Sequence, residues 1–446
     1  MSQHSTIPEL RSRIGDISSA IEAQELLLRD LYGQRSDAQQ KINSFLDPMA
    51  RLPLELQSHI FLQVSVDSHP NPEPNGLPMV LLTVSRMWRD IALSTPRLWC
   101  TLEMDSLPRG PDYSRICDIW LSRARNLPLS LTLSGSPPLE QSVQDLVKRY
   151  RDQVASLTLK LSPDENDNML SLHLIFGPDA ETSRLSSLKI LSIAAHEVAY
   201  FGGVDEWLDV LRAAPALSSL TLHNTLVDDI DEQVNSQPLY LPSLETLHLG
   251  QFFTWIIGEL ECRTSCLILR HVTLPALKTL SLSNNDIDDG ELLAFFSRSA
   301  PPLESLNVTI PFAFPEPFVS RFLGLIPTLT HLNLSAVADR GVGSEPFLPF
   351  LELLGNSSDI LPKLCKIAFH MDFPVTVDHG RLLRMLVFRA SSCPVRLESF
   401  SLVLPNYGAQ YDYTRYLPNP HVQSSLRKLV DDGLDIHWGS AHQNLL

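Results

Sequence analysis

The sequence predicts an α/β chain in which N-terminal helices precede an irregular solenoid, with parallel strands on the inside and helices on the outside. Three observations predict it: a heptad repeat near the N-terminus, a short apolar helical unit after it, and nine copies of the pattern L-x-x-L-x-L between residues 150 and 404. These features divide the 446 residues into three expected domains, at residues 1–46, 47–105 and 106–446.

The first domain is predicted to be one amphipathic helix. Apolar residues recur at steps of three and four, while Gln24 and Arg35 occupy two positions of the same seam and Gly33 weakens the helix. Two interpretations stay open, namely packing on a neighbouring part of the chain and a homodimeric coiled coil through residues 14–45. The apolar seam consists of Ile14, Ile17, Ile21, Leu28, Leu31, Ala38, Ile42 and Phe45.

The second domain is predicted to hold two or three short helices. Pro53 suits the first turn of a helix that runs to about Val64, because a first-turn N–H has no helical acceptor. The loop "DSHPNPEPNGLP" (67–78) then ends that helix with four prolines, and a helical period resumes in "MVLLTVSRMWRDIALSTPRLW" (79–99). Such a small unit has more apolar surface than it can cover alone, which is typical of a binding face.

The residues of this second domain resemble the F-box, a helical module that binds the Skp adaptor of cullin-based ubiquitin ligases. The resemblance covers residues 50–100, and the longer insert from Asp67 to Leu77 is similar to that of fungal F-box proteins. Ser85 stands where the family usually has Cys. The matching residues are Leu52, Pro53, Glu55, Leu56, Ile60, Phe61, Val84, Ser85, Arg86, Trp88, Arg89, Ile91, Ala92, Pro96, Leu98 and Trp99.

The resemblance implies that this domain binds the Skp adaptor and, through it, the cullin scaffold. The alternative is an ordinary helical hairpin whose apolar face is buried on the next domain. The residues expected to contact the adaptor are Leu52, Pro53, Leu56, Ile60, Phe61, Val84, Trp88, Ile91, Leu98 and Trp99.

The third domain is predicted to be a solenoid because its leucine motifs alternate with amphipathic stretches. The motifs begin at residues 154, 188, 217, 244, 277, 303, 329, 364 and 397, and each intervening helical stretch ends near a proline. No unit of this kind buries its leucines alone, so the units are expected to stack. The pattern resembles the leucine-rich-repeat family, although the family's asparagine is kept only at Asn285.

Side chains that alternate with the leucines are expected on the open face of this sheet. They are small, polar and nearly uncharged, which suits hydrogen bonding to a peptide or protein, and a merely solvated face is the alternative. The candidate target-binding residues are Thr221, His223, His248, Ser281, Asn307, His331 and Asn333.

Composition argues against nucleic acid and anionic membranes as partners. The formal charge is −16, with 51 acidic residues against 35 Lys and Arg. Six scattered cysteines and the absence of a leader-like start favour a reducing, intracellular setting, cytoplasmic or nuclear. The longest apolar run is too short for a membrane-spanning helix.

We expect no catalytic, cofactor or metal site. Cys262 and Cys266 form the closest cysteine pair, with only His271 nearby, and a structural zinc site needs four ligands. Histidines of the polar face come from different repeats, which favours solvated or hydrogen-bonded rings over metal ligands. No phosphate-binding glycine loop or nucleophile motif occurs in the sequence.

Taken together, these parts predict a non-enzymatic substrate receptor of a Skp–cullin–F-box ubiquitin ligase. The second domain would hold the adaptor, and the repeat array would hold an unidentified target protein. The alternative is an interaction scaffold that dimerises through its N-terminal helix and has no role in ubiquitin transfer.

Overall fold

A computed structural model describes residues 7–66, 76–104, 111–135, 141–161, 169–170, 185–228, 237–250, 267–283, 289–310, 315–336, 345–371, 377–404, 417–440 and 443–445. The chain divides into two compact units. The first unit holds Met1–Glu103 and Ile116–Leu127, and the second unit holds Met104–Arg115 and Pro128–Leu446. Most of the insert from Asp67 to Leu77, together with Cys262, Cys266 and Asn285, lies outside the described residues.

The first unit opens with the long helix α1, which runs over 40 residues from Ile7 to Leu46. Every side chain of α1 that the structure describes is exposed. The heptad seam is therefore not covered by any described part of the same chain.

Short helices follow α1 and build a small apolar core. They are η1 (Pro48–Arg51), α2 (Leu54–Val66), α3 (Leu81–Val84), α4 (Arg86–Ser94) and η2 (Pro96–Trp99). The Phe61 and Trp88 rings lie 5.0 Å apart between α2 and α4. The helix predicted after Pro53 is present as α2, and Ser85 caps α4 by accepting a hydrogen bond from the Trp88 N–H at 3.2 Å.

A second aromatic cluster closes the first unit. Trp99 meets Trp120 edge to face at 5.0 Å, where Trp120 comes from the last part of α5 (Pro111–Arg123). The Arg123 guanidinium lies 4.3 Å from the Trp99 ring centre, and Trp99 Nε1 donates to the Ala92 carbonyl at 2.9 Å. Both tryptophans are fully buried, so this cluster belongs to the core.

The second unit is a long sheet in which sequence order and spatial order nearly coincide. Its strands follow the order β2-β3-β5-β6-β8-β10-β11-β12-β13-β14-β15, and each neighbouring pair is parallel. This order confirms the predicted solenoid of parallel strands. The strands are β2 (Leu129–Gly135), β3 (Val154–Leu161), β5 (Ile190–Gly203), β6 (Ser219–Asp228), β8 (Thr246–Gly250), β10 (Thr279–Ser283), β11 (Ser305–Ile310), β12 (His331–Ala336), β13 (Lys366–Met371), β14 (Ser399–Val403) and β15 (Asp435–Ser440).

Four shorter strands and β1 (Thr101–Met104) complete the described strands. β16 (Gln443–Asn444) pairs antiparallel with β15, and β4 (Met169–Leu170) pairs with β5. β7 (Leu239–Tyr240) and β9 (Val272–Thr273) form a separate parallel pair.

In-register leucines form the core of the second unit. Leu220, Leu247 and Leu280 are paired directly across three neighbouring strands, and the following motif leucines continue a second row in the same register. All three are at most 1% exposed. Each of the nine motifs contains one strand, whereas β2 and β15 extend the sheet beyond the motifs at either end.

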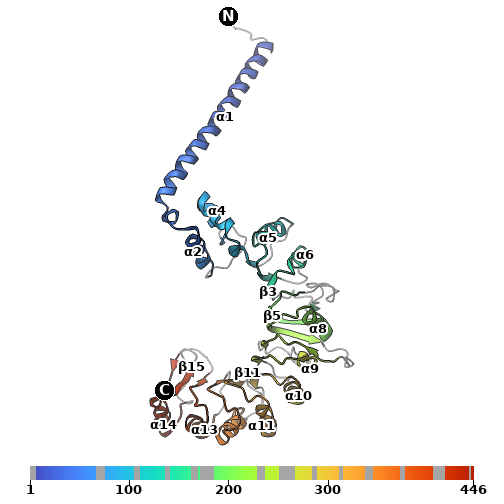
Figure 1. Cartoon of the computed structure of the whole chain (residues 1–446), viewed down its shortest axis with the longest axis vertical. Coiled ribbons are helices and arrows are strands. Elements are labelled where there is room, and N and C mark those ends of the chain that lie inside the picture. The colour runs from blue at the N-terminus through green and yellow to red at the C-terminus, as the bar shows by residue number, and fades with distance from the viewer. Residues whose placement is uncertain are drawn as a thin grey trace. The chain divides into compact units, whose positions relative to one another are not determined.

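Helices cover the leucine side of the strands, and Figure 1 shows α10, α11, α13 and α14 side by side there. The amphipathic stretches expected between the motifs, at residues 204–217, 290–303, 318–329 and 380–395, coincide with α8, α10, α11 and α13. The described helices of this unit are α6 (Gln141–Tyr150), α8 (Val204–Ala213), α9 (Ile268–His271), α10 (Asp289–Ser299), α11 (Glu316–Gly324), α12 (Leu348–Asn356), α13 (His379–Ser391) and α14 (Pro420–Asp431).

Two arginines, each near the end of an outer helix, bind their own repeat to the preceding one by hydrogen bonds. Arg298, near the end of α10, donates to the carbonyls of Leu269 and Val272. Arg389, 1% exposed near the end of α13, donates to four carbonyls, one in the last turn of α12 and three in the segment after it. The four acceptors are Leu354, Ser357, Ile360 and Leu361, at 2.8–3.2 Å. These bonds satisfy carbonyls that a helix end leaves without partners.

Replacing Arg389 with Met should strongly destabilise the array. The change orphans buried carbonyls, so we expect a loss of about 2–4 kcal/mol in the free energy of unfolding, measured by urea denaturation. Arg381→Met on the same helix is the matched control, because Arg381 is part-exposed in ion pairs with Glu352 and Asp378. It should cost less than about 1 kcal/mol. Equal losses for the two variants would contradict the role given to Arg389.

Candidate protein-binding surfaces

The first candidate surface is the apolar face that the first unit leaves exposed. Leu56 and Ile60 lie one helical turn apart on α2, and their side chains are 51% and 39% exposed. Pro53 and Val84 are also exposed, whereas Leu52 and Trp88 are half-buried. These six of the ten expected adaptor contacts therefore reach the surface.

The other four expected contacts require a correction. Phe61, Ile91, Leu98 and Trp99 are at most 3% exposed and build the core of the first unit. Their side chains cannot meet a partner unless the unit itself opens. The physical reason is that Phe61 packs on Trp88 between α2 and α4, and Ile91 lies on the buried side of α4. Leu98 and Trp99 belong to η2, where Trp99 packs on Trp120.

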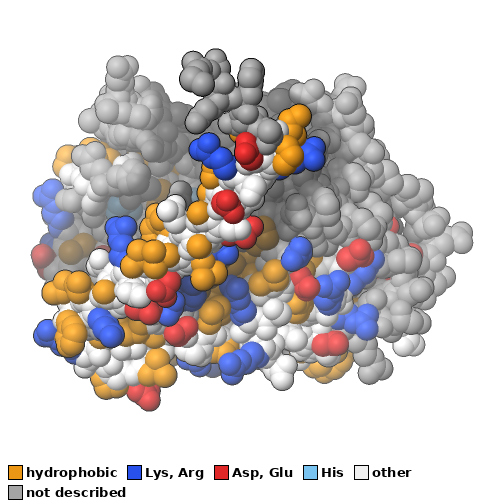
Figure 2. All heavy atoms as spheres, turned by 90° about the horizontal axis from the view of Figure 1, so that it is seen from above, with side chains coloured by type: hydrophobic (Ala, Val, Ile, Leu, Met, Phe, Trp, Pro, Cys, Tyr) orange, Lys and Arg blue, Asp and Glu red, His pale blue; other side chains and the backbone are white. Residues whose placement is uncertain are grey.

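Three exposed residues extend the surface beyond the sequence prediction. Val64 lies one turn after Ile60, so that Leu56, Ile60 and Val64 form a stripe along α2, and Leu54 begins the same helix. Val80 stands next to α3. We call Leu52, Pro53, Leu54, Leu56, Ile60, Val64, Val80 and Val84 the docking face. Figure 2 shows hydrophobic side chains at the described surface on one side of the molecule, among charged ones.

One carboxylate holds the helices behind the docking face together. Asp47 Oδ1 accepts from the Met49 N–H at 2.8 Å, and its Oδ2 accepts from Trp88 Nε1 at 2.7 Å. Gln57 holds the short helix η1 in place, because its Nε2 donates to the carbonyls of Met49 and Leu52. Asp47 was not among the residues expected from the sequence, because its partner Trp88 is 41 residues away.

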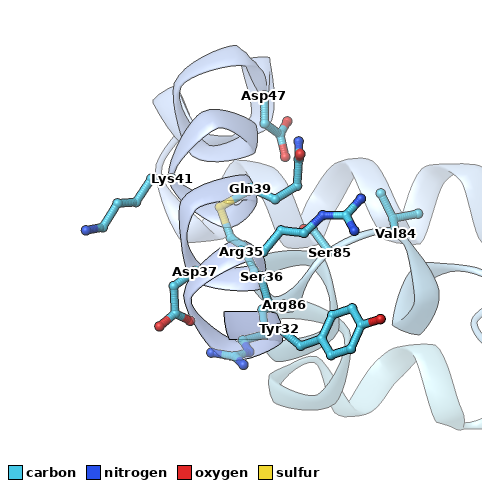
Figure 3. Close-up of a pocket in the computed structure, with 11 residues that line it drawn as sticks. Tyr32, Arg35, Ser36, Asp37, Gln39, Lys41, Asp47, Val84, Ser85 and Arg86 are labelled. Carbon is cyan, nitrogen blue, oxygen red and sulfur yellow. The ribbon is translucent and has the colours of Figure 1, made fainter. Parts of the chain in front are cut away.

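A cavity borders this face. It has a volume of about 830 Å³ and is lined by the C-terminal half of α1 and the start of α4 (Figure 3). Tyr32 and Arg35 of α1 and Arg86 of α4 belong to its lining. Val84 borders both the cavity and the docking face, so these two features of the first unit are continuous.

The second candidate surface is a polar row on the open face of the sheet. Thr221, His248, Ser281, Asn307 and Asn333 are paired in one continuous register across β6, β8, β10, β11 and β12. All five are partly exposed, while the apolar residues on either side of each are buried. The structure thus brings five of the seven expected target contacts into one line, which we call the polar row.

The two remaining residues lie beside the polar row. His223 lies two residues after the row residue of β6, on the same face, and pairs with Gly250. His331 lies two residues before the row residue of β12 and pairs with Ser305 and Lys366. A Cβ atom at Gly250 would lie 2.5 Å from His223 Nδ1, so any larger residue there would force the His223 ring to move.

Two amides of the polar row lack a hydrogen-bond donor. Asn307 Oδ1 and Asn333 Oδ1 are buried and have no partner, although the two residues are direct neighbours in register. A buried acceptor without a donor costs free energy. Because both oxygens are buried, they lower the stability of the array and are not available to a partner protein.

Two histidines of this surface, His223 and His248, have pKa values that their surroundings lower. Burial lowers the pKa of His223 below its ordinary value of 6.5. Burial also lowers the pKa of His248, and the nearby charge of His223 lowers it further. Uncharged rings therefore dominate at neutral pH, so the surface recognises a partner by hydrogen bonding rather than by charge.

No protein-family model matches the sequence, and no curated protein matches it. Eight chains of solved structures do match. One belongs to the crystal structure of the TLR13–ssRNA13 complex, with 14% identity over 68% of this chain and a TM-score of 0.34. The match covers 46% of that chain, less than half of its length. At this TM-score the two folds are not established as the same, and the solenoid of this chain is shown by its own strand order.

The described residues contain no group of three or more His, Cys, Asp or Glu side chains placed to hold a metal ion. Within the same residues, no helix is long and apolar enough to cross a membrane. The pair Cys262 and Cys266 lies outside this part of the chain.

Replacing both Asn307 and Asn333 with Thr should stabilise the array. The change removes two orphaned acceptors and adds β-branched residues to strands, so we expect a gain of about 1 kcal/mol in the free energy of unfolding. Urea denaturation measures it, with Ser281→Thr in the same row as the control for strand preference. A lower urea midpoint for the double Asn→Thr variant than for the Ser281→Thr control would show that both amide oxygens already accept hydrogen bonds.

Replacing His223 with Asn should raise the pKa of His248. The substitution removes the repulsive charge but leaves the larger effect of burial, so the pKa should rise while staying below 6.5. Because the folded pKa values are lowered, the two rings contribute stability above pH 6.5 that is lost as the pH falls below it. NMR titration of the His248 ring protons measures this change, with His421→Asn as the control. An unchanged His248 pKa in the His223→Asn variant would mean that the two rings do not interact.

Proposed function

We propose that this chain is a substrate receptor of a Skp–cullin–F-box ubiquitin ligase. The docking face holds the Skp adaptor, and the polar row and its surroundings hold a target protein. The observation that carries the proposal is the docking face itself, an apolar surface on the F-box-like helices that no described part of the chain covers.

Adaptor binding is supported by the cost of leaving this face in water. Burying one Leu, Ile or Val side chain contributes about 1.5–3 kcal/mol, and several such side chains lie together on α2. The core behind them is closed by Phe61 and Trp88 and by the Asp47 carboxylate. An exposed apolar face on a rigid core suits a stable interface, because binding then costs little conformational entropy.

Target binding is supported by the opposite chemistry of the array. Its open face presents partly exposed residues with hydroxyl, amide and imidazole groups in one continuous register. The receptor would perform no chemistry of its own. It would raise the effective concentration of target lysines near the charged conjugating enzyme, in the way that any two-site linker does.

Changing Leu56 and Ile60 together to Ala should abolish adaptor binding. Both side chains are exposed, so the substitution removes contact area while leaving the core of the first unit unchanged. Co-expression with the adaptor, followed by size-exclusion chromatography, measures complex formation. The matched control is His59→Ala with Gln63→Ala, which changes the exposed polar flank of the same helix.

We expect the control to retain the complex and the apolar variant to elute without the adaptor, with unchanged circular dichroism. Complex formation by the apolar variant in a monodisperse sample would contradict the proposed docking face. A wild-type chain that never binds the adaptor would remove the receptor assignment altogether.

The second candidate function is a scaffold that dimerises through α1 without any role in ubiquitin transfer. The exposure of every α1 side chain that the structure describes favours a second partner surface. Adaptor binding separates the two functions, because a scaffold of this kind has no reason to bind it.

A further inference from the structure

We propose that α1 pairs with α1 of a second copy of this chain as an antiparallel coiled coil. This inference is independent of the proposed receptor function. It starts from the exposed heptad seam and from the positions of the two polar residues within it.

The seam is long and uncovered. Its seven large apolar side chains are 50–78% exposed, and they follow the three-and-four spacing of a coiled coil for more than four heptads. They are Ile14, Ile17, Ile21, Leu28, Leu31, Ile42 and Phe45. Because a helix gains most of its stability from packing, a 40-residue helix with a bare apolar seam needs a partner.

The extent of the seam is sufficient for a specific dimer. If each large apolar side chain loses roughly 60–120 Å² of exposed surface, two copies bury roughly 800–1,700 Å², against about 1,200 Å² for the smaller stable interfaces. From Ile14 to Phe45 the seam runs roughly 47 Å along the helix axis.

The polar seam positions point to a second copy as the partner. Gln24 and Arg35 are equally distant from the midpoint between Leu28 and Leu31. A two-fold axis through that midpoint places Gln24 opposite Arg35 of the second copy and Leu28 opposite its Leu31. The same axis pairs Ile21 with Ala38, Ile17 with Ile42, and Ile14 with Phe45. The two polar residues of the seam thus face each other across the two helices, and all the remaining pairs are apolar.

The parallel arrangement lacks this match. It would place Arg35 directly against Arg35 of the second copy inside the seam, where like charges repel with little water to screen them. The seam is therefore complementary to itself only when the two helices run in opposite directions. In that arrangement the two first units begin at opposite ends of the coiled coil, roughly 50 Å apart along its axis.

Light scattering on the full chain tests the proposal. The wild type should show twice the 49.9 kDa mass of one chain. Leu28→Lys with Leu31→Lys should give the monomer, because both changes fall in the central layers. The matched control is Ala23→Lys with Leu26→Lys, which puts the same charges on the outer side of the helix and should leave the dimer intact.

One further variant tests the direction of the helices. Gln24→Glu should tighten the dimer by roughly threefold, because each new carboxylate meets Arg35 of the second copy. In a parallel dimer the same change would place two carboxylates together and loosen the dimer. A monomeric wild type, a dimer that survives the central lysines, or a dimer loosened by Gln24→Glu would each overturn the proposal.

Discussion

The burial of two rows of leucines between the strands and the outer helices is the constraint on which the array depends. Each strand contributes one side chain to each row; on β6 these are Leu220 and Leu222. The parallel register places them beside apolar side chains of the neighbouring strands β5 and β8, so that both rows continue. No strand covers its own leucines, so every repeat is stable only against the next one. The polar row exists because alternation sends the intervening residues to the other face.

The two units handle their apolar surface differently. The array buries its leucines almost completely and exposes hydroxyl and amide groups, whereas the first unit buries Phe61 and Trp99 but leaves Leu56 and Ile60 in water. A receptor that joins two proteins benefits from this separation, since the apolar face and the polar row cannot easily accept the same partner. The neutral histidines extend the contrast, because they add hydrogen-bonding capacity without charge.

The solenoid could be predicted from the sequence because alternating leucines report directly which side of a strand is covered. Strand β15 was missed because Ile436 and Trp438 replace the leucines of the motif. For the first unit, periodicity identified apolar residues but could not separate Phe61 and Ile91, which pack inside, from those outside. The bond between Asp47 and Trp88 and the orphaned amides depend on distant chain segments, which no local pattern reports.

We propose that the apolar face of α2 and α3 is bare because another protein covers it. Hydrogen–deuterium exchange of the full chain, with and without the Skp adaptor, tests this proposal. We expect the adaptor to slow exchange in residues 54–66 and 80–94 and to leave exchange in the strands of the array unchanged. Equal exchange in both samples, at adaptor concentrations well above those of a typical specific complex, would contradict it.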